Sequence, residues 1–286
     1  MGRAKTARPF FFEAKSVVRQ TDFSINTKKT VAPVYLVGAG PGDPELLTMK
    51  AHRLLGEADV VVYDRLVATP ILDLVPKGTS RIYVGKAARS HHMVQDEINA
   101  LLAKLAHAGR TVVRLKGGDP YIFGRGSEEA VFLKQHGVPV CVVPGITAAS
   151  GCAAALGVPL TQRGMATGVR FVTGHRQGDG LLDLNWASLA DPDTTLVLYM
   201  GLSTIGAITE NLIAAGLSKD TPAAAIANGT TSKQQVCVAS LARLPEKLGQ
   251  SDFRAPVLIV IGKVAAYAEQ SADDWRSLEF AAFHHG

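Results

Sequence analysis

The stretch that decides the fold is Val34-Tyr-Leu-Val-Gly38-Ala-Gly40-Pro41-Gly42-Asp43-Pro44, near the start of the chain. An apolar run that ends in three glycines and is followed by Asp-Pro and a leucine-rich segment predicts a strand, a tight loop and a helix. Asp43 suits the N-cap of that helix, and Pro44 suits its first position, where a backbone N–H would have no partner. A glycine loop at a helix N-terminus usually faces a ligand.

The nearest familiar pattern for this loop is the dinucleotide fingerprint Gly-x-Gly-x-x-Gly. Counted from Gly38 and Gly40, the third glycine would fall at Asp43, which puts a carboxylate where a pyrophosphate would sit. The loop is therefore a poor phosphate cradle. A dinucleotide-dependent oxidoreductase stays an alternative class of enzyme, and it predicts tight NAD(P) binding.

The composition indicates a globular protein with a large core. The chain has 286 residues, of which 47% are hydrophobic and 19% charged, and this length suits two α/β domains. No apolar run is long enough to span a bilayer, so no membrane partner is expected. Cys141, Cys152 and Cys237 occur singly, as expected for reduced thiols in a cytoplasmic protein.

The net charge of +5 is dispersed along the chain, which argues against a nucleic-acid partner. A dispersed positive surplus is compatible with an anionic small-molecule substrate. It is equally compatible with ordinary solubility, so the charge alone decides nothing.

From Val34 onward, strand and helix patterns alternate, which predicts an α/β fold with mostly parallel or mixed sheets covered on both faces. Pro144-Gly145 marks a break between two such lobes. The expected organisation is a flexible N-terminal arm at 1–32, an N-terminal α/β domain at 33–145, a C-terminal α/β domain at 146–268 and a tail at 269–286.

A cleft between the lobes, lined by loops at the carboxyl ends of strands, is the expected ligand site. The loops expected there are Gly38–Asp43, Asp64-Arg65, Gly85-Lys86, Gly117–Pro120, Gly174-His175 and Met200-Gly201.

Two strand ends carry candidate acid and base groups. Asp64, followed by Arg65, is either a base at the mouth of the cleft or part of a surface charge pair or helix cap. The spacing alone slightly favours the structural role. Lys86 is either an ordinary solvated lysine or a group that neutralises substrate carboxylates or donates a proton.

The segment Leu115–Gly126, Leu-Lys-Gly-Gly-Asp-Pro-Tyr-Ile-Phe-Gly-Arg-Gly, is the most unusual in the chain. Gly117 and Gly118 allow a ligand to approach the backbone closely. Asp119 could pair with an ammonium group or shape the loop, and Arg125 could reach a carboxylate. A ligand-binding role is favoured over a merely complicated turn.

Other kinds of catalytic site find little support. His91-His92 and His284-His285 are adjacent pairs whose side chains point in different directions, so a metal site is not expected. No Gly-x-Ser-x-Gly elbow is present to support Ser-His-Asp chemistry.

The order of these segments resembles that of the uroporphyrinogen-III C-methyltransferases, a family within the tetrapyrrole methyltransferases. The resemblance covers roughly residues 33–265. It is carried by Gly38–Asp43, Val62–Val67, Val84–Lys86, Leu115–Gly126, Val143–Gly151, Pro159–Thr161, Thr173–His175, Tyr199–Gly201 and Asn228–Thr230.

The resemblance implies a homodimer of two-lobed subunits that bind S-adenosyl-L-methionine between the lobes and release S-adenosyl-L-homocysteine. The reaction would add two methyl groups to uroporphyrinogen III, giving precorrin-2 through precorrin-1 for sirohaem or cobalamin synthesis. Asp64 would accept a proton and Lys86 would donate one. The implied cofactor contacts are Pro41, Gly117, Gly118, Asp119, Ile122, Thr147, Ala148, Met200 and Gly229.

The substrate's four acetates and four propionates would find partners in Arg65, Arg125 and Lys86. The sequence departs from the family pattern at Ala227, where a glutamate is common before Asn-Gly-Thr. The N-terminal arm is far shorter than the dehydrogenase and ferrochelatase module fused in some relatives, so the expected product is precorrin-2. A methyltransferase acting on a later precorrin and a non-catalytic tetrapyrrole carrier are the remaining alternatives.

Overall fold

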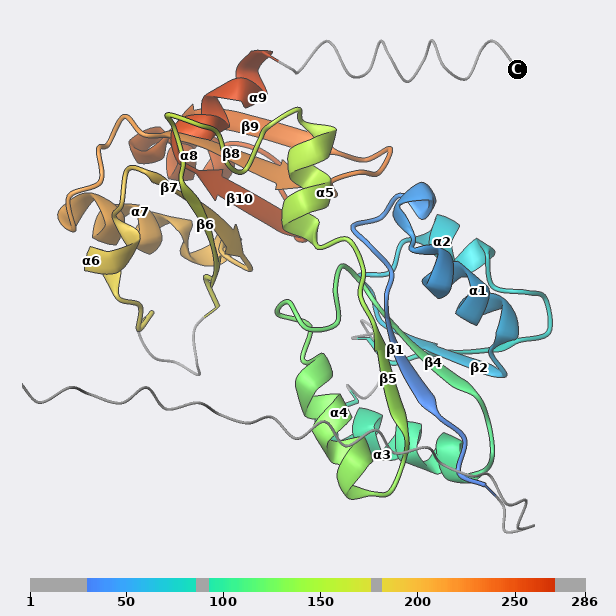
Figure 1. Ribbon diagram of the computed structural model, residues 1–286. Helices are drawn as coiled ribbons and strands as arrows, with labels where there is room; N and C mark the ends of the chain where they lie inside the picture. Colours follow the sequence, from blue (N-terminus) through green and yellow to red (C-terminus); the bar gives the residue numbers. More distant parts are fainter. Residues whose placement is uncertain (1–29, 86–92, 176–181, 271–286) are drawn as a thin grey trace, which may run out of the picture.

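The computed structural model describes residues 30–85, 93–175 and 182–270, which form two α/β lobes around two five-stranded sheets (Figure 1). The first sheet comes from the N-terminal half and the second from the C-terminal half. The lobes are joined at Pro144–Thr147, directly after the last strand of the first sheet.

The first sheet is entirely parallel, in the order β3-β2-β4-β1-β5. Its strands are short, and all but the more polar edge strand β3 are mostly apolar and rich in valine, which suits strands covered on both faces. They are β1 (Val34–Gly38), β2 (Val60–Tyr63), β3 (Ser80–Tyr83), β4 (Val112–Lys116) and β5 (Val140–Val143).

Helices cover both faces of this sheet (Figure 1). Helices α1 (Met49–Glu57) and α2 (Thr69–Asp73) pack on one face through a cluster that includes Leu54, Leu55 and Ile71. Helices α3 (Gln95–His107) and α4 (Gly126–Gln135) pack on the other through Ile98, Leu102 and Leu133.

The predicted cap at Asp43 is confirmed, but the helix after it is shorter than expected. The Asp43 carboxylate accepts a hydrogen bond of 2.8 Å from the Glu45 N–H, and a 3-10 turn spans Pro44–Leu46. The α-helix begins only at Met49, because the Thr48 hydroxyl accepts from the Ala51 N–H at 3.1 Å and forms a second N-cap.

The second sheet is mixed, in the order β6-β7-β10-β8-β9. Only β6 and β7 run parallel, and the other three neighbouring pairs are antiparallel. Its strands are β6 (Gly168–Thr173), β7 (Thr194–Tyr199), β8 (Pro222–Ala227), β9 (Gln235–Ser240) and β10 (Val257–Ile261). Strand β9 was not predicted from the sequence, and it makes a hairpin with β8 through residues 228–234.

Helices also cover both faces of the second sheet. Helices α6 (Trp186–Leu189), α7 (Ile205–Ala214) and α8 (Leu244–Gly249) accompany one face, whose core includes Ile208 and Leu212. Helix α5 (Ala148–Ala155) and the terminal α9 (Tyr267–Gln270) accompany the other. Helix α5 is the first element after the junction, and it lies beside the gap between the lobes in Figure 1.

Candidate active site

Two glycine loops meet at the carboxyl ends of β1 and β4. Gly118 donates its N–H to the Gly40 carbonyl at 2.7 Å, and Gly40 donates to the Gly118 carbonyl at 3.2 Å. A Cβ on Gly38 would lie 2.5 Å from the Gly145 nitrogen and 2.6 Å from the Gly118 oxygen. Three backbone segments therefore cross without side chains between them, because glycine alone fits there.

Asp119 ties the second loop to the junction between the lobes. One carboxylate oxygen accepts from the Tyr121 N–H at 2.8 Å, and the other accepts from the Gly145 N–H at 3.0 Å. The loop-shaping role that the sequence left open is therefore present. Each oxygen keeps a further lone pair for a ligand.

The N-terminus of α5 lies against the second loop and against the end of β7. The Thr147 and Tyr199 hydroxyls lie 2.6 Å apart, and the Ala149 N–H donates to the Tyr199 hydroxyl at 3.0 Å. A Cβ on Gly118 would lie 3.8 Å from the Ala148 nitrogen. Burial raises the pKa of Tyr199 above its ordinary value, so at neutral pH its hydroxyl stays protonated and keeps both partners.

The first glycine loop and the β8–β9 loop also pack against α5. A Cβ added to Gly151 would lie 2.4 Å from the Pro41 ring, and a Cβ added to Gly229 would lie 2.3 Å from the Cys152 sulfur. The Asp43 N–H also donates to the Thr230 hydroxyl at 3.2 Å, which links the first loop of one lobe to the β8–β9 loop of the other.

The structure brings most of the predicted cofactor residues to the surroundings of α5. Each of them either contacts the segment 145–152 or is next in sequence to a residue that does. Ile122, the remaining predicted residue, belongs to the same loop as Asp119. These residues are Pro41, Gly117, Gly118, Asp119, Thr147, Ala148, Met200 and Gly229.

Backbone strain is concentrated in the same loops. Within the described ranges, the non-glycine residues with positive φ are Phe123, Arg125, Met200, Asn228 and Thr230. Residues other than glycine rarely adopt a positive φ, and those that do often cluster at ligand sites. The strain therefore supports a binding role for the loops after β4, β7 and β8.

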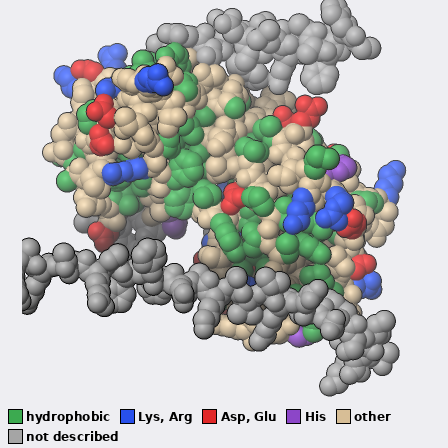
Figure 2. Space-filling view, in the orientation of Figure 1, with side chains coloured by type: hydrophobic (Ala, Val, Ile, Leu, Met, Phe, Trp, Pro, Cys, Tyr) green, Lys and Arg blue, Asp and Glu red, His purple; other side chains and the backbone are tan. Residues whose placement is uncertain are grey.

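An aromatic group that the sequence analysis missed spans the two lobes. The ring centroids of Phe123, in the first lobe, and Tyr199, in the second, are 4.9 Å apart. The ring centroids of Phe171, on β6, and Tyr199 are 5.9 Å apart. Phe123 and Phe171 are both more than one third exposed. Figure 2 shows hydrophobic side chains gathered on both lobes beside the hollow where they meet. This apolar wall suits a large, flat organic ligand.

Asp64 lies at the carboxyl end of β2, as predicted, and is held there by two hydrogen bonds. Its Oδ1 accepts from the Leu66 N–H at 3.1 Å, and its Oδ2 accepts from Arg114 Nη2 at 3.0 Å. The side chain keeps 23% exposure. The neighbouring Arg65 is exposed. Gly117 lies against the same turn, because a Cβ there would be 2.7 Å from Leu66 Cβ.

The ionic partners of Asp64 were also missed from the sequence. Arg114 and Lys116 are 3% and 4% exposed, and both contact Glu129 of α4, which is fully buried. The sequence signal that could have revealed these partners is the alternation Arg114-Leu-Lys116 at the end of an otherwise apolar strand. It places two cations on one buried face and calls for a buried anion.

Arg125 is accessible but already paired. It donates to Glu128 at 2.6 Å, both side chains are more than half exposed, and this hydrogen bond raises the pKa of Arg125. An exposed pair of this kind is worth no more than about 1 kcal/mol, so a substrate carboxylate can replace Glu128. Lys86, His91 and His92 lie outside the described residues.

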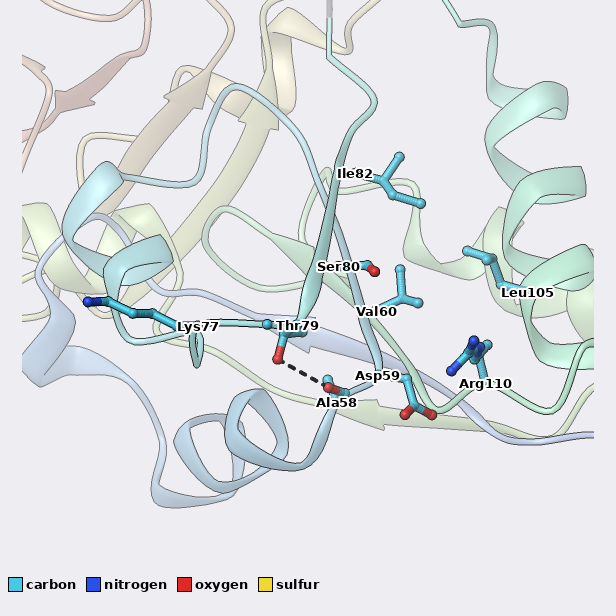
Figure 3. A pocket seen from close by; sticks show the side chains of 10 residues that line it. Ala58, Asp59, Val60, Lys77, Thr79, Ser80, Ile82, Leu105 and Arg110 are labelled. Atoms are coloured by element: carbon cyan, nitrogen blue, oxygen red, sulfur yellow. Dashed lines mark hydrogen bonds between the residues drawn. The ribbon is translucent and has the colours of Figure 1, made fainter.

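The described ranges show no sign of a metal site or a membrane span, and one further hollow lies away from the candidate site. No group of three or more histidine, cysteine, aspartate or glutamate residues there is arranged to hold a metal ion. None of the helices in those ranges combines the length and apolar character that a membrane crossing needs. An open hollow lined by Asp59, Lys77 and Arg110 lies at the amino ends of β2 and β3 (Figure 3), opposite the glycine loops.

The fold and this arrangement define a two-lobed α/β protein with a candidate ligand site where the lobes meet, built mainly from backbone and aromatic rings. The sequence profile of the tetrapyrrole (corrin/porphyrin) methylases matches residues 33–245, and the chain belongs to this family.

Solved structures of the family show the same fold. A uroporphyrin-III C-methyl transferase from Thermus thermophilus, complexed with S-adenyl homocysteine, is 45% identical. The match covers 82% of this chain and 99% of that one, with a TM-score of 0.71. A cobalt precorrin-4 methyltransferase is 26% identical with a TM-score of 0.74, over 85% of this chain and 99% of that one.

Curated relatives are longer than this chain. A siroheme synthase from Stutzerimonas stutzeri (strain A1501) is 55% identical over 244 residues, which are 85% of this chain and 52% of the relative. The chain thus spans about half the length of the curated relatives it matches.

Proposed function

We propose that this protein transfers two methyl groups from S-adenosyl-L-methionine to uroporphyrinogen III, giving precorrin-2 through precorrin-1. The observation that carries the proposal is the juxtaposition of a partly exposed carboxylate, Asp64, with a glycine surface around α5 in a chain of this methylase family. The 45% identity to a uroporphyrin-III C-methyl transferase favours this substrate over a later precorrin.

The residues around α5 fit S-adenosylmethionine. Peptide groups at Gly117 and Gly118 can approach the ligand closely, and the free lone pairs of Asp119 can accept from an ammonium group. The bound cofactor supplies a methyl group activated by a sulfonium, so the protein has to position the acceptor carbon and exclude water. Phe123, Phe171 and Tyr199 form an apolar wall that serves both purposes.

The proposal assigns the remaining tasks to charged residues. Asp64 stabilises the positive charge that methylation places on the pyrrole ring, and it accepts the proton that this cationic ring system then loses from a position other than the methylated carbon, which carries no hydrogen. Arg65 and Arg125 pair with acetate and propionate groups of the substrate. Lys86 follows the end of β3 by three residues and acts as the proton donor in this proposal.

Anaerobic incubation of the protein with uroporphyrinogen III and S-adenosylmethionine tests the proposal. Mass spectrometry should find two added methyl groups and an equivalent amount of S-adenosylhomocysteine. Methylation of later precorrins only would indicate the other methyltransferase activity. Binding of uroporphyrinogen without turnover would indicate a carrier, and tight NAD(P) binding in calorimetry would indicate the oxidoreductase class.

Two properties of the working protein belong to the same proposal. We expect a homodimer in the cytoplasm, producing precorrin-2 for sirohaem or cobalamin. Light scattering coupled to gel filtration measures the subunit number directly, and a monomer that turns over at the full rate would contradict the dimer.

A further inference from the structure

A buried ionic cluster lies beneath the mouth of the site, on the face of the first sheet that α3 and α4 cover. Arg114 and Lys116 extend from β4, and Glu129 extends from the first turn of α4. Their exposures are 3%, 4% and 0%. Burying three charged side chains together is costly unless their charges and hydrogen bonds are matched. The arrangement therefore calls for an explanation beyond packing.

One carboxylate oxygen organises the buried part of this cluster. Glu129 Oε1 accepts from Arg114 Nε at 3.2 Å, from Lys116 Nζ at 3.0 Å and from Gln95 Nε2 at 3.1 Å. Glu129 Oε2 has no hydrogen-bond partner among the residues that the structure describes. Glu129 is thus oriented by the two cations of β4, and it fixes them in return.

The charges of the cluster balance only when Asp64 is included. Two cations and the single negative charge of Glu129 leave one positive charge in excess. Asp64 lies 3.0 Å from Arg114 and supplies the second negative charge. The group that balances the cluster is therefore the same partly exposed carboxylate to which the proposed function gives the proton-accepting role.

Arg114 holds Asp64 in one orientation. Its guanidinium donates through Nε to Glu129, through Nη1 to the Leu115 carbonyl at 3.0 Å and through Nη2 to Asp64 Oδ2. Three acceptors around one rigid planar group leave it no freedom to rotate. The Leu66 N–H fixes the second Asp64 oxygen at 3.1 Å, so the remaining lone pairs of the carboxylate point in defined directions.

We propose that Arg114, anchored by Glu129, is the positioning residue that aims the Asp64 carboxylate into the cleft between the lobes. Arg114 is too deeply buried to touch the substrate, and it acts through Asp64. The inference rests on the proposed catalytic role of Asp64.

A double-mutant cycle on turnover tests the inference. Asp64→Asn, Arg114→Met and the double variant are assayed for methyl transfer to uroporphyrinogen III, and folding is checked by circular dichroism. We expect Arg114→Met to lower kcat at least about tenfold while KM for S-adenosylmethionine stays the same. In the Asp64→Asn background the same change should lower kcat less than about twofold, because no carboxylate is left to aim.

Two further variants keep the test decisive. Arg53→Met, which removes an exposed arginine paired with Glu57 on α1, should leave turnover unchanged. Arg114→Lys retains the charge but offers one ammonium in place of the planar fork, so it should also lower kcat, and again only when Asp64 is present. If Arg114→Met does not fold, Arg114→Lys takes its place in the double-mutant cycle.

The outcomes separate the two levels of the argument. Wild-type turnover in Asp64→Asn would remove Asp64 from the mechanism and overturn the inference with it. A large loss in Asp64→Asn with an equal further loss from the Arg114 change would leave the proposed function intact and overturn the positioning role. Wild-type kcat in a folded Arg114→Met protein would do the same.

Discussion

Gly229→Ala tests the close packing of the β8–β9 loop on α5. The alanine Cβ would lie 2.3 Å from the Cys152 sulfur and 3.3 Å from both Cys152 Cβ and Ile226 Cγ2. Contacts below 3.0 Å are not tolerated, and Cys152 is only 4% exposed, so its sulfur has no open space to enter. Either α5 or the loop has to move.

The expected cost follows from this overlap. Adding one methyl group to a well-packed core costs about 1–3 kcal/mol. A value near 2 kcal/mol should lower the melting temperature by roughly 4–8 °C for a protein of this size. Cys152→Ala alone removes one buried sulfur and should cost about 1 kcal/mol.

The double variant should be more stable than the sum of the two losses predicts. Without the sulfur, the shortest contact of the new methyl group is 3.3 Å, so the two changes compensate by about 1–2 kcal/mol. Thermal unfolding of the four proteins gives this coupling. Titration with S-adenosylmethionine should show weaker binding for Gly229→Ala and a partial recovery in the double variant.

A matched glycine provides the control. Gly56 lies on the exposed side of α1, and a Cβ there would meet nothing within 4 Å. Gly56→Ala should therefore stabilise the helix by about 0.5–1 kcal/mol and leave cofactor binding unchanged. A wild-type melting temperature for Gly229→Ala, or strictly additive losses in the double variant, would refute the packing argument.

Three further predictions concern single groups. Burial, and next the charge of Arg114, lowers the pKa of Lys116, so between this lowered pKa and the ordinary value of 10.5 the unfolded chain binds more protons. The unfolding free energy of the wild type relative to Lys116→Met should therefore rise with pH across that window, and a constant difference in urea titrations would contradict it. Burial raises the pKa of Cys152 to about 12, so mass spectrometry should find it unmodified by iodoacetamide at neutral pH until urea unfolds the protein; rapid labelling of the folded protein would be inconsistent with its burial. Asp43→Ala removes the acceptor of the Glu45 N–H and should lower the free energy of unfolding by about 1 kcal/mol, while Asp43→Asn should retain most of that stability. Equal losses for the two variants in urea unfolding would show that the cap contributes nothing.

The first lobe could be predicted well because its signals are local. Most of its strands are short apolar runs that end at or next to a glycine, a proline or a charged residue, and helices follow with clear start and stop residues. The error at the first helix arose from Thr48, whose capping bond depends on the backbone leaving the first turn. A periodic pattern of leucines does not reveal such an interruption.

The second lobe was harder because its sheet depends on pairings between distant segments. Most residues of strand β9 are half-buried with no regular alternation, and its pairing with β8 depends on a loop that contains two strained residues, Asn228 and Thr230. Alternating strand and helix patterns favour a parallel sheet, yet β10 runs antiparallel to both of its neighbours. Short-range patterns do not determine the direction of such a central strand.

The candidate site could be predicted where glycine was the signal. A glycine marks a place where the backbone itself must come close to something, and most of the predicted glycines do so around α5. The aromatic wall and the Arg114 cluster depend on contacts between residues far apart in the chain, such as Phe123 with Tyr199. One sequence contains no record of those contacts.

The crossing of Gly38, Gly118 and Gly145 has a consequence for how the protein can change over time. A surface built from peptide groups looks the same whatever side chains surround it, so it can persist while most of the sequence drifts. The mouth, by contrast, is built from exposed side chains such as Phe123 and Arg125, which take no part in the crossing. Selection for a new acceptor molecule can therefore change the side chains at the mouth while the glycine crossing beneath them is inherited unchanged.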